Sequence, residues 1–542
     1  MRKKLLSGLF WVLLANLLIK PFWILCIEVG VQNAVGDTTY GFYFVVFNLA
    51  YIFNILLDLG VTNFNTRNIA RNPLLIQKHL SGILTIKVLL LALYVIVTFT
   101  TALLLGYNSR QFGLLAWLCL NQFLNSLITY LRSNFQGLLM FKMDSLLSVL
   151  DRILMIVICA LLLWGPFLPA AADAQAATGR VFRIEWFVYA QTAAYLIAAT
   201  VALIAINKKV GMRHLTWNKS FTLAILRKSA PFALLVLLMA SYNRIDPILL
   251  EKLLPLSGDF HAGVYAKAFR LLDALTMLAY LVSILLLPIY SKLTKEVNIE
   301  KESIETDTPI SEAMETNAYG AGKPGNNATK TTVPNNNDSS TKELADITRM
   351  IFSLMFVVTV SIALTLYWFG DGVLELLYHD STNVGNVGSV FRILILGFVP
   401  IGMTYIFGTL LTANGSLKQL NLFATLALGV NIIVNLICIP RWAANGAAVA
   451  SLTTQTFMGI AQMILACRIF HFRPRRVYIL RLLLFVVLVC FSGYILTALS
   501  TDTLCISNLT SICIMAGVSI LLSFVLRLIQ PKEIFNILKQ EE

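Results

Sequence analysis

The chain has 542 residues, of which 58% are hydrophobic and 13% are charged, and its formal net charge is +14. Soluble domains are about half apolar and carry about 25% charged residues, so this composition excludes a soluble enzyme, a nucleic-acid-binding module and a disordered protein. The eight cysteines form no C-x-x-C pair and the five histidines are scattered along the chain. We therefore expect neither a metal site nor a cofactor.

Fourteen apolar runs are long enough, at about 20 residues each, to cross a bilayer as helices. The first follows Arg2, Lys3 and Lys4 but has no convincing cleavage site, so we interpret it as a membrane helix rather than a signal peptide. The chain is thus predicted to be an all-α integral membrane protein. The expected spans are 9–29, 40–60, 82–106, 113–131, 147–165, 186–206, 231–253, 263–288, 350–369, 390–413, 420–439, 446–467, 478–499 and 509–529.

Basic residues lie almost entirely on one side of the predicted membrane. The short segments on the side of the N-terminus carry 21 Lys and Arg residues. The opposite short loops carry only Arg110, Arg180, Arg183 and Arg441. Because cytoplasmic loops are enriched in Lys and Arg, both termini are predicted to be cytoplasmic. Membrane topology then explains most of the net charge, and no nucleic-acid partner is expected.

The longest polar segment lies between the eighth and ninth predicted spans. Residues 291–348 are rich in Glu, Asn, Thr, Ser and Lys and poor in aromatic residues. Such a composition cannot bury enough apolar surface to fold. We therefore predict a disordered cytoplasmic linker over this segment.

An eight-residue pattern, G-D-x-x-x-G-x-Y, occurs at 36–43 and again at 258–265. Each copy leads into a predicted span, the second and the eighth, so the first six spans match the next six. Six is an even number, which predicts parallel repeats about an axis along the membrane normal, an architecture of transporters. The predicted organisation is a six-helix bundle at 1–229, a second at 230–470 that contains the linker, and two additional helices and a tail at 471–542.

Several ionisable residues fall inside predicted spans, where a charge is expensive and usually functional. The bases are Lys20 in the first span, Arg244 in the seventh, and Lys267 and Arg270 in the eighth. These three helices face one another if the two repeat units oppose. The bases then predict a cationic cavity that binds an anionic group such as a phosphate.

The acidic residues Asp246 and Asp273 lie on the same two helices and leave alternatives open. They neutralise Arg244 and Arg270 locally, or they couple transport to a cation. Arg244 and Asp246 are about 200° apart on a straight helix, which disfavours that pair. Lys267 alternatively extends to the outer lipid headgroups, because its long apolar stem allows it.

Proline interrupts the first and seventh spans at similar places, Pro21 and Pro247. Proline lacks the backbone N–H and bends a helix. Paired interruptions in matching helices indicate a binding site between repeats, so we expect helix breaks with a gating role at these two residues.

Short motifs occur in a fixed order along the chain: LDLGV at 57–61 with RNIA at 67–70, DPILL at 246–250 with GVYAKA at 263–268, PIYS at 288–291, and NLICIP at 435–440 with NGAAVA at 445–450. Together they resemble polysaccharide flippases of the Wzx type. That family belongs to the MOP superfamily, with MATE exporters and MurJ-type lipid II flippases. The likeness covers about residues 1–470.

The resemblance implies two six-helix bundles around a central cavity and alternating access. The implied cargo is an oligosaccharide on undecaprenyl pyrophosphate, moved from the cytoplasmic to the outer leaflet of a bacterial inner membrane for O-antigen, capsule or exopolysaccharide synthesis. Lys20, Arg244, Lys267 and Arg270 would hold the pyrophosphate. A polysaccharide polymerase and glycosyltransferases are candidate partners, and we expect a monomer.

Two features depart from the relatives. Many Wzx-type proteins have twelve helices, and MurJ-type proteins carry several cavity arginines in their first two helices, where this chain has only Lys20. The second difference argues against lipid II as the cargo. A MATE-like exporter of organic cations is the first rival, and it predicts an acidic cavity. A membrane polymerase or ligase is the second, and it predicts a large structured outer loop. We expect a transporter rather than an enzyme.

Overall fold

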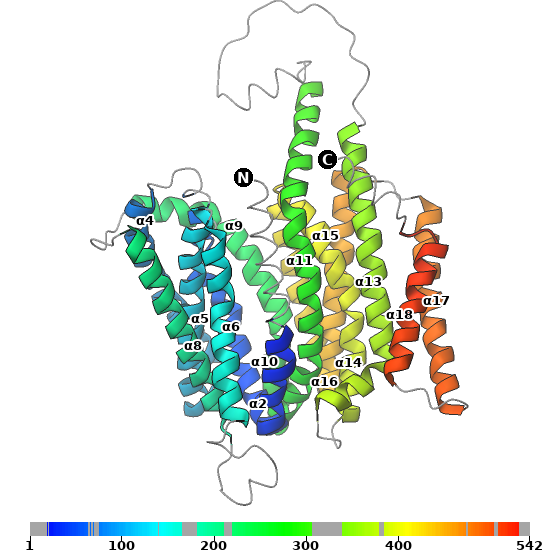
Figure 1. The fold of residues 1–542 in the computed structure, drawn as a ribbon, viewed down its shortest axis with the longest axis horizontal. Coiled ribbons are helices and arrows are strands. Elements are labelled where there is room, and N and C mark those ends of the chain that lie inside the picture. The colour runs from blue at the N-terminus through cyan, green and yellow to red at the C-terminus, as the bar shows by residue number, and fades with distance from the viewer. Residues whose placement is uncertain are drawn as a thin grey trace, which may run out of the picture. The chain divides into compact units, whose positions relative to one another are not determined.

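In the computed structural model every regular element of the described residues is helical (Figure 1). This confirms the prediction of an all-α membrane protein. The predicted site residue Lys20 lies outside the described residues. The structure describes residues 19, 21–62, 65–66, 69, 75–138, 140–164, 182–210, 219–305, 339–378, 384–472, 475–502 and 508–529.

The helices follow the predicted apolar runs but are mostly longer. In chain order they are η1 (Trp23–Glu28), α2 (Val29–Ile52), η2 (Phe53–Leu57), α4 (Leu75–Leu104), α5 (Ser109–Gly137), α6 (Phe141–Trp164), α8 (Ile184–Val210), α9 (Lys219–Arg244), α10 (Asp246–Leu253), α11 (Gly258–Glu305), α13 (Ser339–Leu377), α14 (Val384–Leu396), α15 (Phe398–Ala413), α16 (Leu417–Ile469), α17 (Arg476–Asp502) and α18 (Asn508–Val525).

Among the described residues, ten helices are long and apolar enough to cross a membrane, or eleven when the bent pair α9 and α10 counts as one span. The predicted count of fourteen is not confirmed. Two long helices contain a residue with non-helical backbone angles, Gly36 (φ 78°) in α2 and Ala443 (φ 45°) in α16. Both residues lie between two spans that the sequence predicts as separate helices, so each marks a break in a continuous helical path.

The chain divides into two compact units, each built from several segments. The first unit contains Met1–Leu275, Gly370–Ile395 and Asn421–Thr454. The second contains Thr276–Phe369, Leu396–Leu420 and Gln455–Glu542. The division into bundles at 1–229 and 230–470 with an appendix at 471–542 stays a prediction. All the predicted site residues that the structure describes belong to the first unit.

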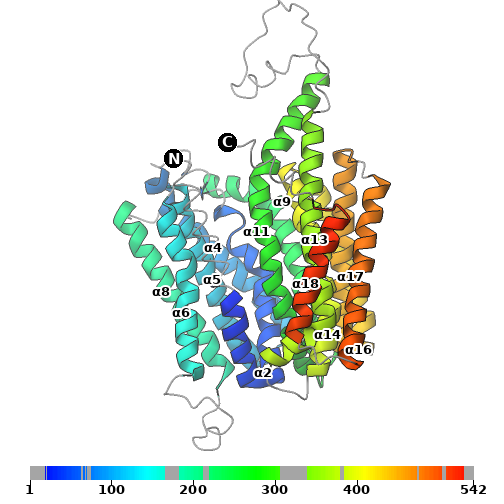
Figure 2. The ribbon, with the colours of Figure 1, turned by 45° about the vertical axis from the view of Figure 1, so that its right-hand side comes forward.

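Helices occupy both ends of the predicted linker 291–348, which corrects its boundaries. In the second unit α11 runs on to Glu305 and α13 begins at Ser339, and Figures 1 and 2 both show these ends beside each other. Leu293, Val297 and Leu344 are buried there. Burial of these apolar residues stabilises both helix ends. The polar composition of the whole segment hides these few apolar positions. The rest of the predicted linker, 306–338, lies outside the described residues.

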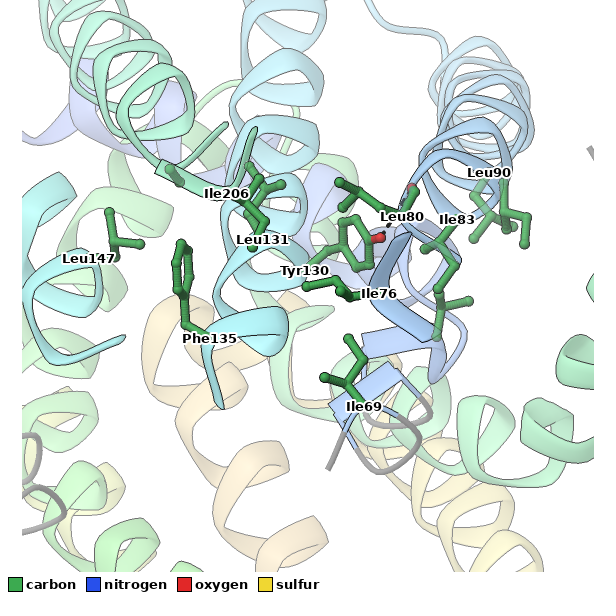
Figure 3. Close-up of a cluster of buried hydrophobic side chains, with 13 residues drawn as sticks. Ile69, Ile76, Leu80, Ile83, Leu90, Tyr130, Leu131, Phe135, Leu147 and Ile206 are labelled. Carbon is green, nitrogen blue, oxygen red and sulfur yellow. Dashed lines mark hydrogen bonds between the residues drawn. The ribbon is translucent and has the colours of Figure 1, made fainter. Parts of the chain in front are cut away.

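The first unit is held by an apolar cluster between α4, α5, α6 and α8 (Figure 3). Ile83, Leu131 and Ile206 are each fully buried in it. The Tyr130 hydroxyl lies in the same cluster and donates to the Leu80 carbonyl at 3.3 Å. Lipid tails are as apolar as leucine, so helices in a bilayer associate through close van der Waals packing and such hydrogen bonds.

Candidate functional site

The path of the chain breaks between α9 and α10, which are bent by 47°. Arg244 is the last residue of α9, and Pro247 lies in the first turn of α10. Proline has no N–H to give to the preceding turn, so the helix cannot continue straight through it. The break brings Arg244 to a helix end. Pro21 precedes the π-helical turn η1, which is a second irregularity in the helical path.

The Arg244 guanidinium lies between two aromatic rings. Its central carbon is 5.0 Å from the ring centroid of Tyr51 and 5.0 Å from that of Phe269. Nη2 donates to Asp273 Oδ1 over a long 3.4 Å. Nη1 is buried and has no hydrogen-bond partner among the described residues. Arg244 is therefore a cation with a hydrogen-bond donor that the described residues do not use.

Arg270 is buried and closely paired. Its Nε is 2.8 Å from Glu28 Oε2, with side chains only 6% and 9% exposed. Nη2 donates to the Tyr40 hydroxyl at 3.2 Å, and Nη1 is 3.7 Å from Asp273 Oδ2. Local neutralisation by Asp273 is therefore present but is the longer of the two ion pairs. Glu28 Oε1 also accepts a hydrogen bond, from Trp23 Nε1 at 3.0 Å.

Lys267 is also buried rather than extended toward a headgroup. Its Nζ is 2.5 Å from Asp37 Oδ1, and both side chains are 4% exposed. The ammonium lies 5.1 Å from the ring centroid of Tyr378, whose hydroxyl donates to the Lys267 carbonyl at 3.1 Å. This ion pair joins α2 to α11.

Asp246 lies outside this charge cluster, although it is two residues from Arg244. It is fully buried and accepts hydrogen bonds from Asn431 Nδ2 at 3.0 Å, Asn435 Nδ2 at 2.8 Å and the Tyr265 hydroxyl at 2.9 Å. The acidic partner of Arg244 is Asp273. Arg244 and Asp246 lie on different helices, because α9 ends at Arg244 and α10 begins at Asp246.

Arg244 and Arg270 thus share one network with Asp273 and Glu28, and Lys267 forms a separate ion pair with Asp37. Two of these acids, Glu28 and Asp37, are functional candidates that the sequence analysis did not select. Glu28 had a signal, because an acid inside the predicted span 9–29 is expensive in lipid. Buried charges of opposite sign that are paired and hydrogen-bonded hold helices in a defined arrangement.

A further ion pair, with a buried lysine, occupies the end of the predicted second span. Lys87 Nζ is 2.7 Å from Asp58 Oδ1, and the lysine side chain is 1% exposed. The ammonium also donates to the Leu57 carbonyl at 3.0 Å and to Ser126 Oγ at 2.9 Å. Lys87 thereby satisfies a carbonyl at the end of η2, where the chain leaves the helix. Its role is to cap this helix end.

The sequence matches two known protein families. The family described as polysaccharide biosynthesis protein matches residues 5–294, more than half of the chain. The chain belongs to this family. A second family, described as lipid II flippase MurJ, matches residues 329–515. No curated protein matches the chain in sequence. Membership confirms the resemblance to polysaccharide flippases that the short motifs predict.

Solved structures agree on the fold of this family member. The lipid II flippase MurJ in an inward closed conformation matches with a TM-score of 0.60 and 13% identity, over 96% of this chain and 97% of that one. An inward-facing multidrug resistance MATE family transporter of the MOP superfamily matches with a TM-score of 0.54 and 13% identity, over 83% and 94%. The fold is therefore that of MOP-superfamily transporters, and the chain is a multi-pass membrane protein.

Proposed function

We propose that this protein flips undecaprenyl-pyrophosphate-linked oligosaccharide repeat units from the cytoplasmic to the outer leaflet of a bacterial inner membrane. The family and the likeness to a lipid II flippase support a lipid-linked cargo for surface polysaccharide such as O-antigen, capsule or exopolysaccharide. A sugar-pyrophosphate headgroup is charged and heavily hydrogen-bonded, so crossing bare hydrocarbon is prohibitive. A protein path with charged groups replaces the lost hydration.

Arg244 is the observation that carries the proposal. It has a buried amino group without an acceptor among the described residues, and a second one with only a long contact to Asp273. Buried donors are almost always satisfied, so an open one indicates an acceptor from outside the described part of the chain. A guanidinium presents paired donors that match phosphate oxygens. Arg244 is thus the proposed first contact of the pyrophosphate.

The other bases would act at a later stage of the transport cycle. Lys267 and Arg270 are already paired with Asp37 and Glu28, so a pyrophosphate must compete with these carboxylates to reach them. Opening of the two ion pairs by alternating access would expose both bases to the cargo. Lys20 completes the proposed set of pyrophosphate ligands.

The remaining assignments follow the topology of the proposed cycle. Two six-helix bundles would move about helix breaks at Pro21 and Pro247, with both termini in the cytoplasm. A polysaccharide polymerase and glycosyltransferases would supply and consume the cargo, and the flippase would act as a monomer.

Ion coupling is proposed for Asp246 and for Asp273. Asp246 is fully buried and held by three neutral side chains. A buried carboxylate without a compensating charge favours uptake of a proton or a cation. Asp273 contacts both Arg244 and Arg270, so its environment changes when either arginine moves.

We expect Asp246→Asn to remove the dependence of flipping on an imposed proton or sodium gradient. The substitution keeps the side-chain volume and removes the charge. The measurement is leaflet transfer in proteoliposomes with and without each gradient. Asp371→Asn is the matched control, because Asp371 is 42% exposed in an ion pair with Arg392. An unchanged gradient response in Asp246→Asn would reject the coupling role.

We expect Arg244→Gln to slow flipping about tenfold or more, because a hydrogen bond to a charged group contributes about 1.5–3 kcal/mol. The full chain is reconstituted with a fluorescent undecaprenyl-pyrophosphate oligosaccharide. Exposure of the headgroup to an impermeant reagent is then followed over time.

Lys292→Gln is the control for this experiment, since the Lys292 side chain is 80% exposed. It should flip the lipid at the wild-type rate. Equal rates for Arg244→Gln and the wild type would remove Arg244 from the site. Wild-type protein that transfers no lipid-linked sugar but exports organic cations would replace the flippase with an exporter.

A further inference from the structure

A ladder of aromatic rings runs along one face of α2. Tyr40, Tyr43, Phe47 and Tyr51 follow one another at intervals of three or four residues, which places them on the same side of a helix. Successive ring centroids are 5.4, 5.8 and 5.9 Å apart. These distances are those of interacting aromatic pairs.

The exposure of the rings rises along the ladder. Tyr40 and Tyr43 are each 1% exposed, Phe47 is half-buried, and Tyr51 is 36% exposed. The buried rings brace the helix, and Tyr43 also meets Phe187 of α8 edge-on at 5.6 Å. The ladder therefore ends in Tyr51, whose ring is the most exposed of the four.

The exposed end of the ladder coincides with Arg244, whose guanidinium lies against the Tyr51 ring at 5.0 Å. A tyrosine that faces only lipid has apolar neighbours. A charged group at membrane depth faces a partner or a watery cavity instead. Tyr51 instead stacks on a cation with unused donors. The ring and the candidate phosphate ligand thus share one binding surface.

We propose that Tyr51, supported by Phe47, is a stacking platform for the sugar attached directly to the pyrophosphate that Arg244 binds. This inference rests on the proposed function. A sugar ring has a face of C–H groups with partial positive charge, and the face of an aromatic ring is negative, so the two stack. In a sugar pyrophosphate the first sugar is bonded to a phosphate. A phosphate at Arg244 would therefore place this sugar close to the neighbouring Tyr51 ring.

Stacking of this kind has a consequence for specificity. Every pyranose offers a C–H face, so a flat ring binds sugars without reading the pattern of their hydroxyls. The platform should distinguish a lipid that carries sugar from one that carries none, and should discriminate little between sugars. It would favour loaded carrier over the empty undecaprenyl pyrophosphate that remains in the membrane.

The experiment compares two lipids on the same full-length protein in lipid nanodiscs. The probes are undecaprenyl pyrophosphate and the same lipid bearing an oligosaccharide. Wild-type protein should bind the sugar-bearing lipid more tightly. Tyr51→Leu should reduce this preference, the ratio of the two dissociation constants, about two- to tenfold. Tyr51→Phe keeps the ring face and should retain the preference.

Two further variants separate the inference from the proposed function. Arg244→Gln should weaken both lipids and leave their ratio unchanged. Tyr189→Leu is the matched control, because Tyr189 is 44% exposed and pairs with Trp117 at 4.9 Å, and it should alter neither lipid. The measured ratio cancels any common effect of Tyr51→Leu on folding or on the conformation of Arg244.

An unchanged ratio in Tyr51→Leu would overturn the platform and leave the flippase intact. Loss of the preference in Tyr51→Phe would overturn it too, since the hydroxyl rather than the ring face would then be responsible. Wild-type protein that binds neither lipid would reject the proposed function itself.

Discussion

Arg270→Gln is expected to destabilise the folded protein by about 3–5 kcal/mol, the usual cost of removing one partner of a buried ion pair. The arginine Nε is 2.8 Å from Glu28 Oε2, and both side chains are less than one-tenth exposed. Without the guanidinium, the Glu28 carboxylate stays buried with one hydrogen bond, from Trp23. Unfolding followed in detergent should show a clearly lower midpoint than the wild type.

The double variant Glu28→Gln with Arg270→Gln is the control that identifies the cause. It removes both charges and leaves two amides of similar volume, so most of the lost stability should return. Equal instability of the single and double variants would contradict the ion pair as the source. A stable double variant also tests the cargo role. A stable double variant that does not flip lipid would assign the Arg270–Glu28 pair to transport, and one that flips lipid would assign the pair to packing alone.

The fold class could be predicted from the sequence because a bilayer permits few solutions. Backbone groups in hydrocarbon must be satisfied within the segment, so long apolar runs must be helices. The boundaries were harder, since polar helix ends such as those of α11 and α13 carry no hydropathy signal. At Gly36 and Ala443 two helices join across a kink. Each kink depends on the backbone angles of one residue, which composition does not encode.

The candidate site was predictable in its residues but not in its pairings. Charges inside apolar runs select Arg244, Lys267, Arg270, Asp246 and Asp273 by their cost alone. Their partners are a matter of tertiary structure. Arg270 meets Glu28, and Lys267 meets Asp37, each across most of the N-terminal half of the chain. A local rule finds only the pair between Arg270 and Asp273, three residues apart, which at 3.7 Å is the longer contact of Arg270.

Gly41→Ala and Gly263→Ala are each expected to disrupt the first unit, because the two copies of the G-D-x-x-x-G-x-Y pattern pack directly on each other. A Cβ atom on Gly41 would overlap the Asp259 carbonyl oxygen, and one on Gly263 would overlap the Asp37 carbonyl oxygen. The contact is reciprocal, as a two-fold relation between the repeats requires. Only glycine allows two backbones to approach so closely.

The expected loss for either substitution is at least about 1–3 kcal/mol, the range for overpacked cores, because the obstructing atoms are backbone and cannot rotate away. Gly113→Ala is the matched control. An added Cβ there meets nothing within 4 Å, and alanine favours a helix over glycine, so the unfolding midpoint should stay or rise slightly. Stable Gly41→Ala and Gly263→Ala variants that still flip lipid would show that the repeats separate at this contact without penalty. Equal losses of stability in both variants would instead support the two-fold relation, since the two glycines then make equivalent contacts in the two repeats.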